Sequence, residues 1–448
     1  MRENPIKAIL NVAATSLSLI IVVAFAVRVG CLWMANHHAP TPFFDIPYGY
    51  ETGHIARSIV LGKGFSSPLS GVDTGPTAWL TPVFPYLLAG VFKLFGIYTY
   101  TSFLVIVTID CLFSTLACVP VFFIGKRLGG LATGAIAAWI WALCPVAIIM
   151  PLSWVWDTCL STLVVGLIVW ATLAVRESKR TRDWAAYGLL WAFGLMLNPA
   201  ILSVLPFLLL WLGSQLRKEN GHWLKLPAVA ALLITMGCIP WTARNYLTFH
   251  KLIPMRSNFG LELWLGNNSQ VTDTLARWLH PDGYPPEREK FVQMGEIAYM
   301  QAKQHEAVQF IASHPRDEMR FLWHRFMDNW TGTSEPIPDI WRFLGWQGQL
   351  TLGTNILLSL LSMVGVLLLF RRERREAWLF AVFPVVYPVI YYVTHTSARY
   401  RHPIDPILCV LASFSIGAAF TAVAHGLSPA KQPAFRAKSA QDLAARAG

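Results

Sequence analysis

Residues 35–100 concentrate side chains that can carry acid–base chemistry. They include Asp45, Glu51, His54, Arg57, Lys63, Asp73 and Trp79. Asp45 follows a long apolar run, so its carboxylate is expected at a membrane surface among aromatic rings. A carboxylate with little water around it has a raised pKa, which suits it to act as a general base. We therefore expect Asp45 to be catalytic; the alternative is a solvated loop acid.

Glu51 is a second candidate base. The pattern of Glu51, Ile55, Arg57 and Ile59 predicts a short amphipathic helix that ends at 62–64, Gly-Lys-Gly. Lying flat on the membrane, this helix would present Glu51 near Asp45. Either acid could serve as the base, and the position of Asp45 near the exit of the first apolar run favours Asp45.

A basic cluster occurs late in the chain. It comprises Arg399, Tyr400, Arg401 and His402, preceded by His395. Arginine forms bidentate contacts with phosphate, and histidine can protonate or hydrogen-bond a leaving group. We expect these residues to bind a phosphate at the level of the lipid headgroups, joined by Arg244 and Arg256; the alternative is general headgroup anchoring.

The composition predicts a polytopic, all-α membrane protein. Of the 448 residues, 54% are hydrophobic and 14% are charged, whereas soluble domains carry about 25% charged residues. The apolar runs predict about ten spans, at 8–34, 101–125, 131–150, 158–175, 184–198, 200–216, 224–243, 348–370, 377–394 and 404–424. With this count, both termini and the Lys/Arg clusters near 2–7, 126–127, 176–182, 217–225 and 371–375 are cytoplasmic, whereas the cluster at 399–402 is on the outer face. The net charge of +11 therefore indicates topology rather than nucleic-acid binding.

Residues 82–96 test this count. The run is short and has two prolines in its first four residues, which predicts a re-entrant or interfacial helix. Counting it as a span would put every later basic cluster on the wrong side. The predicted organisation is an N-terminal module, 1–244, with a first outer loop at 35–100; an extracytoplasmic domain of mixed helix and loop, 245–347; C-terminal spans, 348–424; and a disordered cytoplasmic tail, 425–448.

One pair of charges lies inside the predicted spans. Arg28 is near the outer end of the first span and Asp110 is inside the second. Charges within a membrane are costly and usually pair. We expect a structural Arg28–Asp110 ion pair; the alternative is that Arg28 reaches a donor phosphate.

The first loop resembles that of GT-C fold glycosyltransferases. The similar features are Ile55, Ala56, Ser58, Gly62, Gly64 and Phe65 at the end of the loop helix, and Pro82 and Pro85 in the re-entrant segment. The most similar branch contains protein mannosyltransferases and aminoarabinose transferases. The family's acidic pair stands about seven residues before the Ile-Ala, where this chain has Tyr48.

The resemblance implies a polyprenyl-phosphate-linked sugar donor and an acidic base in this loop. It also implies a role for Asp157, at the outer start of the fourth span, as a second catalytic acid or, with Asp45, as a ligand of a divalent cation such as Mg or Mn; the alternative is a helix N-cap. Asp45 or Glu51 would deprotonate an envelope acceptor (lipid, polysaccharide or protein), with inversion at the sugar. The site would be periplasmic, in the inner (plasma) membrane.

Two other functions remain open. A transporter or flippase needs polar, broken helices that meet in mid-membrane, and only Arg28, Asp110 and the Asn198-Pro199 break fit that pattern. A non-catalytic subunit of an envelope-assembly complex would tolerate replacement of every loop carboxylate.

Overall fold

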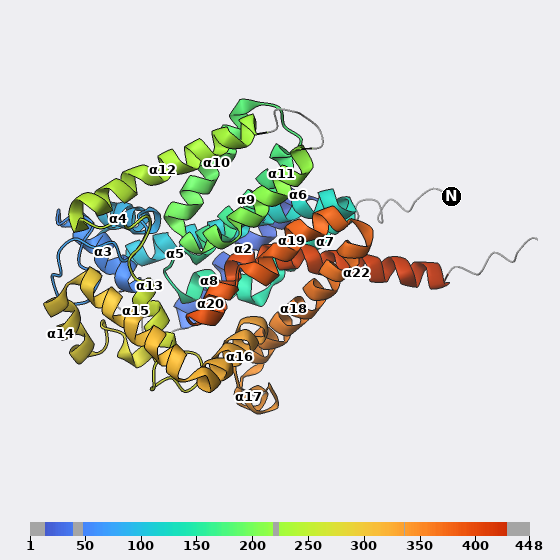
Figure 1. Ribbon diagram of the computed structural model, residues 1–448. Coiled ribbons are helices and arrows are strands. Elements are labelled where there is room, and N and C mark those ends of the chain that lie inside the picture. Colours follow the sequence, from blue (N-terminus) through green and yellow to red (C-terminus); the bar gives the residue numbers. More distant parts are fainter. Residues whose placement is uncertain (1–13, 39–47, 218–223, 336, 428–448) are drawn as a thin grey trace, which may run out of the picture.

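The chain folds into helices throughout the part that the structure describes. The computed structural model describes residues 14–38, 48–217, 224–335 and 337–427 (Figure 1). Within these ranges there are α-helices and short 3-10 helices but no β-strand, and one isolated bridge joins Ser66 and Pro76. The predicted all-α class is confirmed. Asp45 lies outside the described residues, as does most of the predicted tail.

Apolar helices, most of them long, form the body of the molecule. They are α2 (Leu17–His38), α5 (Tyr100–Leu116), α6 (Cys118–Gly129), α7 (Leu131–Leu143), α8 (Pro145–Ser153), α9 (Thr158–Val175), α10 (Thr181–Leu197), α11 (Leu205–Leu216), α12 (Lys225–Phe249), α18 (Trp346–Arg372), α19 (Arg374–Val386), α20 (Val389–Val393) and α22 (Asp405–Leu427). Among the described residues, seven helical segments are long and apolar enough to cross a membrane. The bent pair α7 and α8 makes eight. The chain is therefore a multi-pass membrane protein, and the exact count of ten stays a prediction.

The difference from ten lies in α10 and α11, which correspond to the predicted fifth and sixth spans. Leu197 ends α10, and Asn198 caps a 3-10 turn (Pro199–Ser203) by accepting a hydrogen bond from the Ala200 N–H at 3.1 Å. Proline cannot donate to a helix ladder, so the chain breaks at this point. The break leaves α11 with 12 residues, which span about 18 Å of a hydrocarbon layer about 30 Å thick.

The segment 82–96 forms a short helix, α4 (Val83–Phe95). Its 13 residues are about 20 Å long, too short to span a bilayer. Gly96 ends it with a φ of 95°, a conformation that favours glycine. This length confirms the prediction that the segment is a short apolar helix and not a membrane span.

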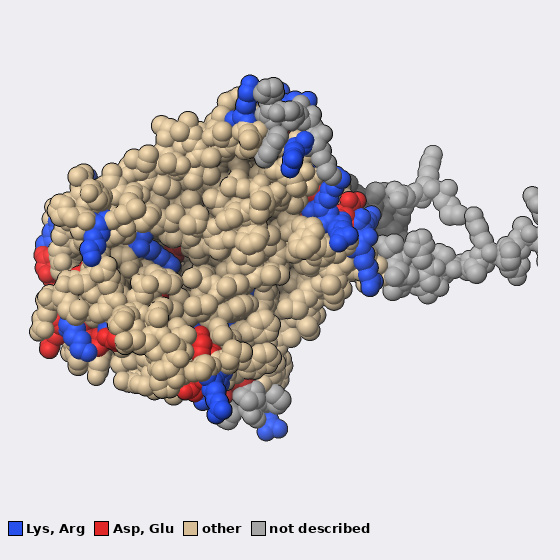
Figure 2. All heavy atoms as spheres, viewed as in Figure 1, with Lys and Arg blue, Asp and Glu red and all other residues tan. Residues whose placement is uncertain are grey.

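Charged side chains gather toward the ends of the molecule. Figure 2 shows a broad band with few charges between these zones. At one end, Arg176 pairs with Glu376, and Arg127 pairs with Glu177. These contacts join the ends of α6, α9 and the start of α19, so clusters that the sequence analysis put on one side do lie together.

The other end carries a small helical domain, which we name the cap domain (residues 250–343). It contains α13 (Phe259–Gly266), the 3-10 turn η2 (Arg277–Leu279), α14 (Pro285–Met294), α15 (Glu296–Ser313), α16 (Pro315–Thr331) and α17 (Ile337–Phe343). Its apolar core, which includes Leu261, Tyr299 and Phe321, also takes in Leu69 and Trp79 from the first loop. The first loop and the cap domain therefore fold as one body at one end of the helical bundle.

Glu296 strengthens this junction. Its carboxylate accepts hydrogen bonds from the Thr77 hydroxyl, from the Ala78 N–H at 2.9 Å and from the Ser257 hydroxyl at 2.6 Å. Burial raises the pKa of Glu296, although these hydrogen bonds oppose the increase.

The predicted Arg28–Asp110 ion pair is wrong. The guanidinium of Arg28 donates to Ser114 Oγ at 3.0 Å, to the Ala142 carbonyl at 3.0 Å and to the Trp141 carbonyl at 3.3 Å. Those carbonyls are free because α7 ends at Leu143, ahead of a proline, and the last carbonyls of a helix have no partner within it. Both carboxylate oxygens of Asp110 are buried without a hydrogen-bond partner among the described residues. Arg28 therefore caps a helix end.

Candidate active site

Five chain segments that lie far apart in the sequence converge where the bundle meets the cap domain. They are the start of α3 (Tyr50–Val60), the loop 154–157 before α9, the segment 256–262 leading into α13, the turn 277–282, and residues 395–400 around α21 (Ala398–Arg401). Each contributes at least one charged or aromatic side chain to a shared cluster, which the following paragraphs build up.

Glu51 is in the first turn of α3. Gly49, the N-cap of α3, and Tyr50, its first residue, both have positive φ angles, 80° and 44°. Such a conformation is unusual for a bulky aromatic residue. Glu51 is 8% exposed, and its Oε1 lies 3.1 Å from His280 Nε2 in the cap domain. Burial opposes protonation of His280, but the hydrogen bond and charge of Glu51 outweigh it and raise the pKa of His280.

Asp157 lies at the start of α9, as predicted. It occupies the N-cap position, but its side chain makes no capping bond to the helix backbone. Instead its Oδ2 accepts a hydrogen bond from the Ser161 hydroxyl at 3.0 Å. Burial raises the pKa of Asp157, and the charges of Arg256 and Arg399 oppose that increase.

Arg399 is held by aromatic rings. Its guanidinium lies 4.3 Å from the ring centre of Trp156 and 4.8 Å from that of Tyr400, and it donates to the Tyr400 hydroxyl at 2.9 Å. Glu262, Glu51 and Asp157 are acids that interact electrostatically with it. No carboxylate forms an ion pair with Arg399 among the described residues, so its charge is available to an anion.

His395 pairs with Glu262, a carboxylate for which the sequence analysis predicted no role. Its Nε2 lies 2.7 Å from Glu262 Oε2, and the Asn258 side-chain amide donates to Glu262 Oε1 at 2.7 Å. Burial opposes ionisation of Glu262, but His395 and Arg256 outweigh it and lower its pKa to about 2. His395 is 6% exposed, and its Nδ1 has no hydrogen-bond partner among the described residues.

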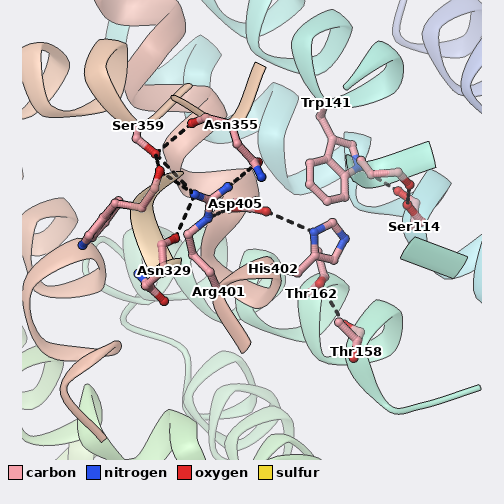
Figure 3. A network of polar contacts seen from close by, with 12 residues as sticks. Ser114, Trp141, Thr158, Thr162, Asn329, Asn355, Ser359, Arg401, His402 and Asp405 are labelled. Carbon is pink, nitrogen blue, oxygen red and sulfur yellow. Dashed lines mark hydrogen bonds and ion pairs between the residues drawn. The ribbon is translucent and has the colours of Figure 1, made fainter. Parts of the chain in front are cut away.

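Arg401 and His402 do not face this cluster, contrary to expectation. Figure 3 shows both in a buried polar network around Asp405. Arg401 Nε donates to Asp405 Oδ1 at 2.9 Å, and His402 Nδ1 lies 3.0 Å from Asp405 Oδ2. The remaining Arg401 donors bind the Asn329 and Trp330 carbonyls, Asn355 Oδ1 and Ser359 Oγ. Arg401 is thus fully engaged inside the protein, and His402 is buried with Nδ1 on Asp405 and Nε2 without a partner among the described residues.

Arg244 is also engaged elsewhere. It donates to the backbone carbonyls of Thr77 at 2.6 Å and Phe65 at 2.9 Å, and it lies over the ring of Trp241. It therefore ties the first loop to the end of α12 rather than joining the cations near Arg399.

Aromatic rings form the wall next to the two acids. Tyr50 precedes Glu51 and packs at 5.9 Å from Trp156, which precedes Asp157, and at 6.1 Å from Trp154. The exposed Arg277 lies over the rings of Tyr50 and Trp154. The sequence analysis missed His280 and the role of Glu262. The contact of His280 with Glu51 joins residues far apart in the sequence, so no local pattern could have indicated it.

A metal site was predicted from Asp45 and Asp157. Within the described ranges, no group of three or more His, Cys, Asp or Glu side chains is arranged to hold a metal ion. Asp45 is outside those ranges, so the Asp45–Asp157 cation site stays a prediction.

Comparisons with known proteins identify the fold. The family model "Dolichyl-phosphate-mannose-protein mannosyltransferase" matches residues 78–248. In the search of curated proteins, no sequence match was found. The oligosaccharyltransferase AglB from Archaeoglobus fulgidus, solved with an inhibitory peptide and a dolichol-phosphate, superposes with a TM-score of 0.53 at 13% identity, over 92% of this chain and 51% of that one.

Two further solved structures are similar. The A. fulgidus oligosaccharyltransferase in complex with Zn and sulfate gives a TM-score of 0.56 at 12% identity, over 91% of this chain and 49% of that one. ArnT from Cupriavidus metallidurans, bound to undecaprenyl phosphate, gives 0.42 at 12% identity, over 91% and 79%. The chain thus spans about half the length of the oligosaccharyltransferases. The GT-C resemblance is confirmed, and the fold is that of polytopic GT-C membrane glycosyltransferases.

Proposed function

We propose that this protein is an inverting membrane glycosyltransferase that moves a sugar from a polyprenyl-phosphate donor to an envelope acceptor. The observation that carries this proposal is the packing around Trp156. The residue after it is Asp157, its ring packs 5.9 Å from Tyr50, which precedes Glu51, and Arg399 lies over it at 4.3 Å. Acids that can take a proton, and an arginine and a histidine that can contact a departing phosphate, are the groups that transfer from a phosphate leaving group uses. The match to the mannosyltransferase model and the shared GT-C fold support the same reaction class.

In the proposed reaction, Glu51 removes the proton of an acceptor hydroxyl. The acceptor oxygen then attacks the anomeric carbon from the face opposite the phosphate, and the bond between that carbon and the phosphate oxygen breaks. The lipid phosphate leaves with the bonding electron pair, and Arg399 and His395 balance its charge. Arg399 is held for this task by Trp156 and Tyr400.

Asp45 is the other candidate base in the first loop, and Asp157 would orient the acceptor or assist the base. A divalent cation held by Asp45 and Asp157 would supply further positive charge next to the phosphate. We place the site on the extracytoplasmic side of the inner membrane, with cytoplasmic termini, because the paired basic clusters near Arg127, Arg176 and Arg375 lie at the opposite end.

The proposal is tested with the purified protein in lipid nanodiscs. Undecaprenyl-phosphate-linked mannose and 4-amino-4-deoxyarabinose are supplied as donors, with envelope membranes from cells lacking the protein as acceptor. Mass spectrometry follows both the release of undecaprenyl phosphate and the gain of sugar by the acceptor. Transfer by the wild type and loss in Arg399→Ala and Glu51→Gln are expected. Full activity of Glu51→Gln with loss in Asp45→Asn would move the base to Asp45, and activity in all three variants would overturn the mechanism.

A further inference from the structure

Two ion pairs of opposite polarity clasp α3 to the turn 277–282 of the cap domain. Glu51 of α3 faces His280 at 3.1 Å, while His54 of α3 faces Asp282 at 3.8 Å. Glu51 and His54 are three residues apart in α3, so they share one face of the helix. In one pair the acid is on α3, and in the other it is on the turn. A shift of α3 along the turn would therefore place Glu51 opposite Asp282, acid against acid.

The turn itself fixes which nitrogen of His280 faces Glu51 as a donor. The backbone N–H of Asp282 points at His280 Nδ1 at 3.2 Å. In the neutral ring Nδ1 therefore accepts, and the single ring proton is on Nε2, directed at Glu51. An edge-to-face contact with Trp79, at 5.8 Å between ring centres, holds the ring plane. His280 is thus a hydrogen-bond donor to Glu51 in its neutral form as well as in its charged form.

The same contact leaves one carboxylate oxygen of Glu51 unused. His280 occupies Oε1, and Oε2 makes no hydrogen bond to any residue that the structure describes. The other charged groups that act on His280 are Glu262 on α13 and Asp282 in its own turn. Asp282 is in turn held by the Ser70 N–H at 2.5 Å, so the turn is anchored to the first loop independently of Glu51.

We propose that His280 is a positioning residue for Glu51, and that the cap domain thereby completes the catalytic base. This inference rests on the proposed function, in which Glu51 takes the acceptor proton. His280 holds Oε1, which fixes the rotamer of Glu51, and the incoming proton is received on Oε2. The base is therefore assembled only when the turn 277–282 is docked on α3.

The first test needs no substrate. A hydrophobic carbodiimide labels only protonated carboxyl groups, and peptide mass spectrometry of the intact, membrane-reconstituted protein measures labelling of Glu51 as a function of pH. Removing a donor makes a carboxylate easier to protonate. Labelling of Glu51 is expected to extend to higher pH in His280→Ala but not in His280→Gln, whose amide can still donate. Identical labelling curves in wild type and His280→Ala would overturn the inference.

The second test measures sugar transfer from undecaprenyl-phosphate-linked mannose with the same variants. We expect kcat to fall about 10- to 100-fold in His280→Ala, because a misplaced base costs rate rather than donor binding, with KM for the donor unchanged. His280→Gln is expected to recover most of the rate. The acidic limb of the pH–rate profile moves to higher pH in His280→Ala alone, a change that a purely structural role would not produce.

A matched control is His324→Ala. His324 is also a cap-domain histidine near an acid, with Asp273 at 3.9 Å, but it has no contact with Glu51. It is expected to retain wild-type kcat. Equal loss in His280→Ala and His280→Gln, with a parallel loss of thermal stability, would overturn the positioning role. Loss of transfer in His280→Ala while Glu51→Gln stays active would refute Glu51 as the base. The labelling experiment would then decide by itself whether His280 positions Glu51.

Discussion

His395 Nε2 lies 2.7 Å from Glu262 Oε2, and this pair joins the loop before α21 to the cap domain. Since Nε2 is committed to Glu262, Nδ1 is the only ring nitrogen that a ligand could engage, and it has no partner within the described residues. The pair therefore resembles the pair of Glu51 and His280. In both, one atom is used for positioning and another is left for substrate.

The Glu262–His395 pair predicts a pH-dependent stability. Its carboxyl has a pKa lowered from 4.5 to about 2 in the folded protein. A lowered pKa contributes stability that is present above the unfolded value and is lost as the pH falls toward the folded value. The difference in melting temperature between wild type and Glu262→Gln should therefore be constant from pH 8 to about 5 and shrink below about 4.5. Differential scanning fluorimetry in nanodiscs measures it, and a constant difference down to pH 3 would contradict the assignment.

Arg399 is predicted to act on the donor. Arg399→Ala should lower kcat/KM for the polyprenyl-phosphate sugar by roughly 100-fold, because one charge-assisted contact to the departing phosphate is lost. Arg399→Lys keeps the charge but not the planar stacking on Trp156, so its activity should fall between those of wild type and Arg399→Ala. Steady-state transfer assays measure the series.

The exposed Arg277, which lies over Tyr50 and Trp154, provides the control for Arg399. Arg277→Ala removes an arginine from the same aromatic wall but not from the proposed phosphate site. A loss in Arg277→Ala as large as in Arg399→Ala would show that the aromatic wall, rather than the guanidinium of Arg399, sets the rate.

The sequence could predict elements whose patterns are local. The apolar runs, the break at Asn198-Pro199 and the short helix at 82–96 follow from residue spacing and proline alone. Partner choice between distant segments could not be predicted in that way. Arg28 binds carbonyls at the end of α7, which have no partner within the helix because Pro145 follows it. No residue near Arg28 or Asp110 in the sequence indicates that this helix end lies beside Arg28.

The basic cluster after His395 shows the same limit. Because all of its cations are close in sequence, the sequence predicts one role for them, the binding of a phosphate. The helical turn of α21 separates them, and Arg399 reaches Trp156 while Arg401 reaches Asp405. Asp405 could have indicated this separation. It follows Arg401 by four residues, a spacing at which an acid and an arginine can pair on one helix face.

The buried network of Figure 3 predicts large stability losses. Arg401 and Asp405 are 3% and 1% exposed. Removing one partner leaves a buried charge without its counter-charge, which lowers the free energy of unfolding by about 3–5 kcal/mol. Arg401→Met is therefore expected to lower the melting temperature strongly, whereas Arg401→Met combined with Asp405→Leu should recover part of the loss. Arg182→Ala, in an exposed pair with Asp183, is the control and should change little.

Asp110 and Arg28 are predicted to be energetically independent. Arg28→Met removes hydrogen bonds to Ser114, Ala142 and Trp141 and leaves two buried carbonyls unsatisfied, so it should destabilise the protein by several kcal/mol. Asp110→Leu removes a buried carboxyl that has no partner among the described residues and should leave stability unchanged or raise it. A double-mutant cycle on thermal or denaturant unfolding should then give a coupling energy below about 0.5 kcal/mol. A coupling of 2 kcal/mol or more, roughly what a direct buried contact gives, would mean that the two side chains do pair in the membrane.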